Sequence, residues 1–440
     1  MSTKPKRIKK KSFQTVRGMR DILPEEQMYW EKIKQVVKKS AETYGFGKIE
    51  TPILEDVDLF AKGTGAFTDI VEKEMFILKT KGGDRLCLRP EFTPAVIRAY
   101  LEDGLSSLPR PVKLYSVGPI FRYERPQKGR YRQSYQANFE IIGEKDPVLD
   151  AQLIQMFFSI SANLGLKKLV TRINSIGCPQ CRLSYKRELL KFYRKIRKSL
   201  CPDCQRRLQN NPLRLLDCKN SKCVQLSEDA PQIIDFLCDE CHNHFKNVLE
   251  YLDELEIPYI LDSRLARGLD YYTKTVFEIW PEDEDGRQLA LAGGGRYDGL
   301  VKLLGGRDTP AAGFALGLDR IIGLMKGEKV KVPSRACSEV FLVQLGELGK
   351  KKSLKLFEKL QKAGIRTTTS FNRDKMTSQL KIANKLKARF ALILGQKEAL
   401  DETIIIRDMI SGTQETVPIE KIVKILKRKL KNKLIVKRLS

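Results

Sequence analysis

The sequence has no apolar run long enough to cross a membrane, which requires about 20 consecutive apolar residues. Its first residues, MSTKPKRIKKK, are basic and lack the apolar stretch of a secretory signal peptide. Neither a P-loop nor a helix-opening GxGxxG pattern occurs, so the usual signatures of phosphate-loop and dinucleotide sites are missing. We therefore expect a cytoplasmic protein with no membrane partner.

Acidic residues are outnumbered by basic ones, 54 to 81, which gives a net charge of +27. Residues 1–11 contain six basic and no acidic side chains, and residues 421–440 contain nine basic and none acidic. This excess favours a polyanionic partner such as nucleic acid, although such tails can also be simply solvated. The length of 440 residues and the hydrophobic content of 42% fit a globular protein of two or three domains.

Disulfides are not expected in a cytoplasmic chain, so its ten cysteines point to metal binding or to buried thiols. Eight of them lie within 64 residues and form four pairs: Cys178 and Cys181, Cys201 and Cys204, Cys218 and Cys223, and Cys238 and Cys241. Four such pairs can supply two tetrahedral zinc sites. The spacing does not decide which pairs combine, and His242 or His244 could replace a thiolate.

The order of expected elements divides the chain into three regions. Residues 25–44 read as a helix, a hairpin is expected around Gly82 and Gly83, and a helix at 147–164 precedes a strand at 168–175. From Cys178 to about residue 255, short charged helices punctuated by cysteines indicate an inserted small domain. A plausible linker spans residues 326–335, and residues 338–432 then alternate strand and helix, which predicts a parallel or mixed α/β domain of about 95 residues.

Polar residues alternate with apolar ones along the segment that ends at Gly143. Ser134, Gln136, Asn138 and Glu140 would share one face of a strand, opposite Tyr135, Ala137, Phe139 and Ile141. The preceding loop carries four cations: Arg125, Lys128, Arg130 and Arg132. A solvated outer sheet face is the simpler interpretation. The cationic loop favours instead a site for an anionic ligand with a small polar head.

Further polar clusters occur in the strand-rich region. Glu91 and Thr93 in LRPEFT stand two apart and are expected on one strand face, as are Arg122 and Glu124. The other clusters are RGLDYY at residues 267–272, GGGRYD at 293–298, and GLDR, which ends in Arg320 at the expected start of a helix. Each cluster alone could be a surface ion pair, aromatic packing or a tight turn.

In order, these clusters resemble the histidyl-tRNA synthetase family, a branch of the class II aminoacyl-tRNA synthetases. The matching motifs are RGMRDILP, TDIVEKEMF, LRPE-T (with Phe92 at the open position), FRYERPQKGRYRQ, NSIG, RGLDYYT, GGGRYDGL and GFALGLDR. The resemblance implies an α+β catalytic domain over residues 1–325, built on a mixed or antiparallel sheet flanked by helices. It further implies a helical cysteine-rich insertion at 177–255, a C-terminal α/β anticodon-binding domain at 336–432 and a basic tail at 433–440.

The resemblance implies ATP-dependent ligation of L-histidine to tRNA(His) through a histidyl-adenylate, with Mg²⁺ accompanying the ATP. It implies a homodimer, with the first long helix and the strand near Pro52 at the interface. Any metal in the insertion would be structural. The alternative within the family is its regulatory paralogue, which serves ATP phosphoribosyltransferase and binds histidine without aminoacylation. That paralogue lacks the C-terminal domain and tends to lose the ATP-contacting arginines.

By the same resemblance, the catalytic residues are Arg122 and Arg267, which act on the α-phosphate. The histidine-binding residues are Glu91, Thr93, Gln136, Glu140, Tyr271, Tyr272 and Tyr297. The ATP-binding residues are Arg122, Glu124, Arg267 and Arg320, the last lying against the adenine. The residues that contact tRNA are Arg125, Lys128 and Arg130.

The chain departs from the usual family pattern at four positions. Phe92 and Pro94 stand where glycine and alanine are usual, and Ser134 stands where an aromatic ring normally stacks on adenine. Asn138 replaces a frequent glycine on the strand face that is expected to bind histidine. A zinc-dependent nucleic-acid-binding module would explain the cysteines and the charge, but it would leave the strand-rich region unexplained.

Overall fold

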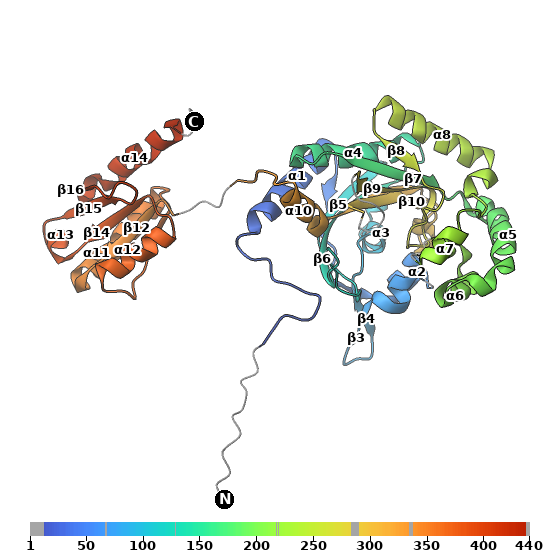
Figure 1. The fold of residues 1–440 in the computed structure, drawn as a ribbon, viewed down its shortest axis with the longest axis horizontal. Helices are drawn as coiled ribbons and strands as arrows, with labels where there is room; N and C mark the ends of the chain where they lie inside the picture. The colour runs from blue at the N-terminus through green and yellow to red at the C-terminus, as the bar shows by residue number, and fades with distance from the viewer. Residues whose placement is uncertain are drawn as a thin grey trace, which may run out of the picture. The chain divides into compact units, whose positions relative to one another are not determined.

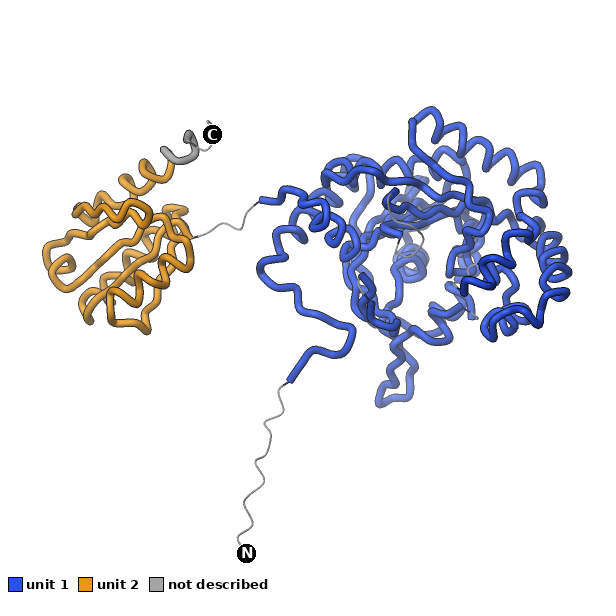
Figure 2. The backbone as a smooth tube through the Cα atoms, in the orientation of Figure 1, with its two compact units in different colours: residues 1–333 blue, residues 334–440 orange. Residues whose placement is uncertain are grey.

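The structure is a computed structural model that describes residues 13–66, 68–127, 129–216, 218, 220–282, 290–333 and 338–436. Of residues 432–436 it describes the backbone only. Within it the chain forms two compact units, residues 1–333 and 334–440 (Figure 2). Lys128, the N-terminal basic segment, the side chains of the predicted basic tail and Cys337 lie outside the described residues.

An eight-stranded sheet forms the centre of the first unit, in the order β1-β5-β6-β11-β10-β9-β7-β8 (Figure 1). Its strands are β1 Gly47–Lys48, β5 Val112–Phe121, β6 Gln133–Ile142, β7 Leu169–Ser175, β8 Tyr259–Leu261, β9 Thr273–Pro281, β10 Ala292–Arg296 and β11 Ala311–Gly317. The two edge strands pair in parallel and the inner pairs are antiparallel. The predicted mixed sheet is confirmed.

The alternating pattern of β6 sorts its side chains as the sequence predicts. Ala137, Phe139 and Ile141 are buried in the main hydrophobic core, and Tyr135 packs against it. The ring of Phe139 stacks on that of Phe314 from β11, with centroids 5.0 Å apart. The apolar face of β6 therefore fixes the register that aims the polar face at the opposite side of the sheet.

Helices cover both faces of the sheet. On the apolar face of β6 lie α1 Gln27–Thr43, α4 Val148–Leu164, α8 Asp239–Glu254 and α10 Leu318–Gly327. On the other face lie α2 Val57–Thr64, α3 Thr93–Glu102 and α9 Leu300–Leu303. Buried Val96, Tyr100 and Leu300 pack there with Tyr271 and Tyr297 in a second core. The helices expected at 25–44 and 147–164 are confirmed.

A small sheet of order β2-β4-β3 adjoins this second face. Its strands are β2 Leu54–Asp56, β3 Phe76–Lys79 and β4 Arg85–Leu88, so the predicted hairpin around Gly82 and Gly83 is confirmed. Two predicted strand faces are wrong. β4 ends at Leu88 and α3 begins at Thr93, because Pro94 in the first turn favours a helix start. β5 ends at Phe121, so Arg122 and Glu124 lie on the loop beyond it.

The insertion emerges after β7 and forms a bundle of short helices beside the sheet (Figure 1). Its helices are α5 Pro179–Lys195, α6 Pro202–Asn210 and α7 Ser221–Leu226, followed by the long helix α8. Buried Tyr185, Leu189, Tyr193 and Leu208 give it a core of its own. The chain then returns to the sheet through β8.

The second unit is a mixed five-stranded sheet of order β13-β12-β14-β15-β16 with helices packed on it. Its elements are β12 Val340–Gln344, α11 Gly346–Lys362, β13 Thr367–Thr369, α12 Met376–Lys385, β14 Phe390–Leu394, α13 Gln396–Leu400, β15 Thr403–Asp408, β16 Gln414–Pro418 and α14 Ile422–Val436. Sequence reasoning missed β16, whose side chains are mostly exposed and polar. In the described part of the chain, no helix is both long and apolar enough to span a bilayer.

Candidate active site

Glu140 is the one acid of β6 and lies on its polar face, with 1% of its surface exposed. Thr93 Oγ1 donates to its carboxylate at 2.6 Å, and Asn138 Nδ2 and the Tyr297 hydroxyl also donate to it. Burial raises the pKa of Glu140 to about 8, against the hydrogen bonds from Thr93 and Asn138. Three neutral donors therefore fix the position of the carboxylate, but none of them carries a positive charge to balance it.

Glu91 is a second buried carboxylate, on the loop between β4 and α3. The Tyr271 hydroxyl donates to it at 2.8 Å and Thr64 Oγ1 donates at 2.9 Å. Burial raises its pKa, while the positive charge of Arg122 opposes the shift. A buried carboxylate of this kind suits a cationic ligand group such as an ammonium.

Three tyrosines join the two carboxylates. The rings of Tyr271 and Tyr272 lie 4.7 Å apart between centroids, and Tyr271 lies 5.5 Å from Tyr297. Burial raises the pKa of both Tyr271 and Tyr272, so their hydroxyls remain protonated donors at neutral pH. RGLDYY and GGGRYD, which are distant in sequence, therefore form one aromatic wall.

Arg267 lies beside this wall, with its guanidinium 5.6 Å from the centre of the Tyr272 ring. Its Nη1 donates to Glu278 Oε1 at 2.5 Å. Although burial opposes the charge, Tyr272 and Glu278 raise the pKa of Arg267. A Cβ at Gly293 would stand 2.7 Å from its Cζ, so the glycine makes room for the guanidinium.

Three more guanidinium groups gather at the loop beyond β5. Arg122 donates from Nε to the carbonyl of Pro90 at 2.9 Å, and Arg130 pairs with Glu124 at 3.5 Å. Arg320, in the first turn of α10, donates to the carbonyl of Ala290 at 2.7 Å. Burial, with the charges of Arg130 and Arg122, lowers the pKa of Arg320 to about 10. Such mutual repulsion favours binding of an anion among them.

The remaining predicted residues lie around this group. Gln136 is partly exposed between Gly118 of β5 and Gly317 of β11. A Cβ at Gly118 would lie 2.8 Å from Arg89 Nη2, so the glycine makes room for that guanidinium. Ser134 lies one step nearer the loop on the same face, and Arg125 is exposed on the loop. Lys128 lies outside the described residues.

Sequence reasoning missed several residues that shape the site. Thr64 and Glu278 bond Glu91 and Arg267, and Gly313 lies opposite Glu140, where any Cβ would overlap the carboxylate. A single acid within the apolar segment TKTVFEIW was a usable signal for Glu278. Arg267 and Asp270 of the RGLDYY motif do not form an ion pair with each other. Asp270 instead accepts a hydrogen bond from Asn211 Nδ2 at 2.9 Å.

A buried ionic network lies under the aromatic wall. Asp150 accepts from Arg296 Nε at 3.2 Å and from Thr275 Oγ1 at 3.1 Å, and its Oδ2 lies 2.6 Å from His244 Nε2. Despite burial, Arg296 and His244 lower the pKa of Asp150. The network fixes the backbone beside Tyr297 and ties the insertion's last helix, α8, to the sheet.

A sequence model of the family described as Histidyl-tRNA synthetase matches residues 18–179 and 222–321. The chain belongs to the histidyl-tRNA synthetase family. A model described as Anticodon binding domain matches residues 339–429, within the second unit. The first match is interrupted at 180–221, where four of the eight paired cysteines lie.

Similar proteins agree with this membership. A Histidine–tRNA ligase of Desulforamulus reducens is 43% identical over 93% of the chain and 98% of its own length. One of Dehalococcoides mccartyi is 43% identical over 95% of the chain and its full length. The crystal structure of apo S. aureus histidyl-tRNA synthetase is 35% identical, covers 94% of the chain and all of that protein, and superposes with a TM-score of 0.77.

A Bacillus halodurans structure described as an ATP phosphoribosyltransferase regulatory subunit/histidyl-tRNA synthetase shares only the fold, with a TM-score of 0.60 at 20% identity over 87% of the chain and 98% of that protein. The expected family, fold class and histidine–tRNA ligase activity are therefore confirmed, and the regulatory alternative is less well supported. Family membership also implies use of ATP with Mg²⁺. The roles of individual residues stay predictions.

Eight cysteines of the insertion lie in two groups of four. Within each group, the four sulfur atoms all lie within 4.8 Å of one another. The groups are Cys178, Cys181, Cys238 and Cys241, and Cys201, Cys204, Cys218 and Cys223. Each group has the composition of a four-coordinate metal site. Neither includes a histidine among the described residues, so the expectation that His242 or His244 could supply a ligand gains no support.

Proposed function

We propose that the chain joins L-histidine to tRNA(His) at the site between β6, the aromatic wall and the arginine cluster. The observation that carries the proposal is that two buried carboxylates, Glu91 and Glu140, share the site with guanidinium groups whose charges repel one another, among them Arg122 and Arg320. One half suits an amino acid with a basic ring, and the other suits a triphosphate.

Histidine would be held by its two nitrogen-bearing ends. Glu91, fixed by Tyr271 and Thr64, accepts from the α-ammonium group, and Thr93, which donates to Glu140 in the structure, would contact the same group. Glu140 accepts an imidazole N–H, while Gln136, Tyr272 and Tyr297 contact the rest of the ring. An apolar side chain of similar size would leave these buried polar groups unpaired, which disfavours its binding.

In the first step, a carboxylate oxygen of histidine attacks the α-phosphorus of ATP and the bond to pyrophosphate breaks. Arg122 and Arg267 stabilise the negative charge that builds on the α-phosphate oxygens. Each is oriented before substrate arrives, Arg122 by the carbonyl of Pro90 and Arg267 by Glu278. Arg320 lies flat against the adenine, a role that its guanidinium can fill in place of the aromatic ring missing at Ser134.

In the second step, a hydroxyl oxygen of the terminal ribose of tRNA attacks the carbonyl carbon and AMP leaves. Arg125, Lys128 and Arg130 on the loop beyond β5 would contact the tRNA backbone near its 3′ end. The second unit would bind the anticodon, consistent with its match to anticodon-binding domains. A cytoplasmic location stays a prediction.

Mg²⁺ would enter with ATP and neutralise charge on its phosphates. Glu124 and Glu278 are carboxylates beside the arginine cluster, and oxygen donors of this kind suit a hard cation. Few protein ligands are needed, because the phosphates themselves supply most of them.

Histidine-dependent exchange of pyrophosphate into ATP tests the proposal directly. Exchange should occur with histidine and fall to background with the other nineteen amino acids. A folded protein that binds histidine but shows no exchange would support the regulatory function instead. Absence of both binding and exchange would overturn the assignment of this site.

We also propose a homodimer that involves the small sheet near Pro52. Leu54, Phe76, Leu78 and Leu88 share one face of that sheet, and Leu54 and Leu78 remain 46% and 44% exposed. Apolar sheet faces left open in this way mark interaction surfaces. Analytical ultracentrifugation should find a dimer for the wild-type chain and a monomer for Leu54→Glu/Leu78→Glu, and a wild-type monomer would contradict the proposal.

A further inference from the structure

The eight paired cysteines occupy a repeated structural position. Cys178, Cys201 and Cys238 each precede a helix with extended backbone angles, at φ −81°, −65° and −72°. In each case the second cysteine of the CxxC pair lies in the first turn of that helix. The fourth pair differs, since Cys218 lies in the preceding loop and Cys223 lies in α7. The same turn therefore presents two sulfur atoms in one direction at three places.

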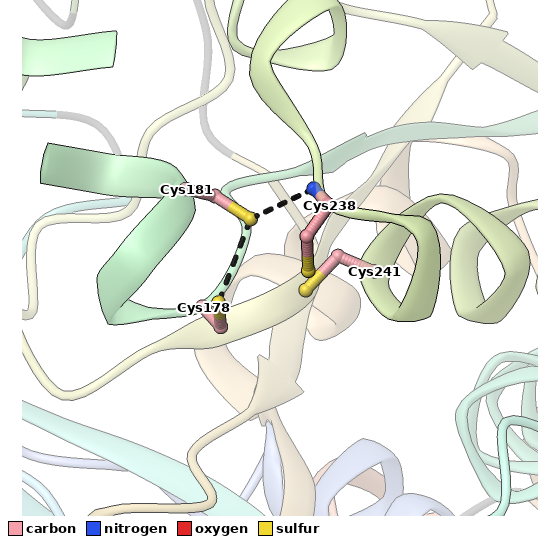
Figure 3. A group of neighbouring side chains, drawn as sticks. All are labelled: Cys178, Cys181, Cys238 and Cys241. Carbon is pink, nitrogen blue, oxygen red and sulfur yellow. Dashed lines mark hydrogen bonds between the residues drawn. The ribbon is translucent and has the colours of Figure 1, made fainter. Parts of the chain in front are cut away.

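The pairs meet two by two. Cys178 and Cys181 face Cys238 and Cys241, so the pair that opens the insertion meets the pair that closes it (Figure 3). The two inner pairs form the other group. Of the three ways to combine four pairs, the fold therefore selects the nested one, which the spacing alone left open.

The distances fit one metal ion in each group. The sulfur atoms of Cys178 and Cys181 lie 3.5 Å apart, and those of Cys201 and Cys218 lie 3.8 Å apart. A tetrahedral zinc ion with Zn–S bonds of about 2.3 Å has sulfur atoms about 3.8 Å apart. A disulfide would instead require about 2.05 Å. With all four sulfur atoms of a group within 4.8 Å of one another, there is room for a single ion but not for a multi-iron cluster.

Backbone amides support the sulfur atoms across each group. The amide of Cys238 donates to Cys181 Sγ at 3.2 Å, and the amide of Cys201 donates to Cys223 Sγ at 3.3 Å. Each bond links one pair to its partner pair. Donors of this kind orient and stabilise thiolate ligands of a metal.

We propose that the insertion binds two structural zinc ions, an outer one through Cys178, Cys181, Cys238 and Cys241 and an inner one through Cys201, Cys204, Cys218 and Cys223. Four protein ligands close each site and leave no position for a substrate, so the ions serve the fold rather than the chemistry. This assignment does not depend on which amino acid the catalytic site binds.

The outer ion anchors the insertion to the catalytic sheet. Just before Cys178, the amide of Ile176 donates to the carbonyl of Lys274 at 2.7 Å, and the amide of Lys274 donates to Gly177 at 3.0 Å. Arg182, one residue after Cys181, donates to the backbone carbonyl of Tyr272 at 3.2 Å. The ion would therefore stabilise the backbone on which the aromatic wall stands.

The inner ion holds the part of the insertion that contacts Asp69, just before the helical turn Ile70–Glu74. α6 and the turn after it carry Arg207 and Arg214, which donate to Asp69 Oδ2 at 3.1 and 2.8 Å. Asp69 precedes the helical turn Ile70–Glu74, and the carbonyl of Glu74 accepts from the amide of Tyr123, next to Arg122. A metal ion in the inner group would therefore stabilise α6 and the following turn in the conformation that places Arg207 and Arg214 against Asp69.

Metal analysis of the full-length chain, purified without chelator or added zinc, tests the proposal without any mutation. We expect two zinc ions per chain, released by a mercurial reagent at four thiols per ion. Less than one zinc per chain with eight freely reacting insertion thiols overturns it, and so does stoichiometric iron in place of zinc. Cobalt-substituted protein should show the thiolate-to-cobalt absorption and visible bands of a tetrahedral site.

Variants test the nested pairing. Cys178→Ser, Cys241→Ser and the double variant Cys178→Ser/Cys241→Ser should each keep one zinc ion, whereas Cys178→Ser/Cys201→Ser should keep none. One retained ion in that last variant would show a different pairing. Cys87→Ala, which changes a buried cysteine outside the insertion, is the control and should keep two. Thiol titration of the wild-type chain still decides the presence of the sites where a variant does not fold.

Discussion

Glu140 combines near-complete burial with a carboxylate that lacks a cation among its bonded partners. Its pKa is about 8 in the folded protein, above the ordinary value of 4.5. The folded state therefore holds a proton that the unfolded state releases between these values. The contribution of Glu140 to the free energy of unfolding is fully present below about pH 4.5. It falls as the pH rises toward 8, by on the order of 1 kcal/mol per pH unit.

Glu140→Gln should remove this pH dependence. In the ligand-free protein, the melting temperature of the variant should rise relative to wild type as the pH increases from about 5 to 8. Scanning calorimetry over that range measures the difference. A constant difference across the range would contradict the raised pKa. In the exchange assay the variant should lose about 10- to 100-fold in kcat/KM for histidine.

Arg267→Ala should remove most of the stabilisation of the α-phosphate. We expect exchange to fall about 100- to 1000-fold while histidine binding, measured by calorimetric titration, stays within a few fold. Arg264→Ala changes a cation three residues upstream and serves as the matched control. Equal loss of binding and exchange would show a structural role for Arg267 instead.

Individual site residues could be predicted in part. Alternation along one strand placed Gln136, Asn138 and Glu140 on a common face, because that pattern is local. The bond from Tyr271 to Glu91 joins residues 180 positions apart, and no local pattern encodes it. The buried hydrogen bond from Asn138 to Glu140 also depends on the neighbouring strand β11, where Gly313 leaves space for the carboxylate.

At the scale of elements, the pairing of β6 with β11 sets the depth of the proposed histidine site, because Gly313 lies opposite Glu140. A Cβ at Gly313 would lie 2.5 Å from the carbonyl of Phe139 and 2.8 Å from the Tyr297 hydroxyl. Gly313→Ala should therefore destabilise the protein by about 1–3 kcal/mol and raise the KM for histidine at least tenfold.

Gly323→Ala is the matched control for Gly313→Ala. Gly323 lies inside α10 with nothing within 4 Å of an added Cβ, so alanine there should stabilise by about 0.5–1 kcal/mol. Chemical denaturation and steady-state kinetics compare the two variants. Similar behaviour of both would contradict a steric requirement at β11.

The docking of α6 beside the turn Ile70–Glu74 rests on Asp69. Asp69→Asn should weaken its ion pairs with Arg207 and Arg214 and speed hydrogen exchange in the turn Ile70–Glu74. Asp203→Asn removes an exposed partner of Arg206 within the same helix and should leave that turn unchanged. Unchanged exchange in Asp69→Asn would show that the insertion does not hold the loop.

Elements were predicted best where periodicity was strong and boundaries lay at glycine or proline. α1, α4 and the β3–β4 hairpin followed their patterns closely. The strand expected through Glu91 and Thr93 failed because Pro94 starts a helix, a local signal that outweighs a two-residue spacing. The sequence pattern does not predict β16, because this exposed edge strand has no alternation of apolar and polar residues.

At the scale of the whole molecule, the net charge of +27 should separate tRNA binding from amino-acid activation. Raising salt from roughly 50 to 200 mM should weaken tRNA binding at least tenfold, since binding releases counterions from the phosphates. Pyrophosphate exchange, which involves one buried site, should change less than twofold. Filter binding and exchange in the same buffers measure both, and equal salt sensitivity would contradict a dominant role for the surface charge.

The meeting of Cys178 and Cys181 with Cys238 and Cys241 has a consequence for engineering of the chain. Because the two ends of the insertion lie side by side, the length of the polypeptide between them can change without moving these ends apart. A segment of other length, or a foreign domain with adjacent termini, could be joined at this junction in place of residues 182–237, at the loss of the contacts of Arg182 with Tyr272 and of Arg207 and Arg214 with Asp69. The cysteine cluster therefore marks a natural graft point in an otherwise continuous enzyme.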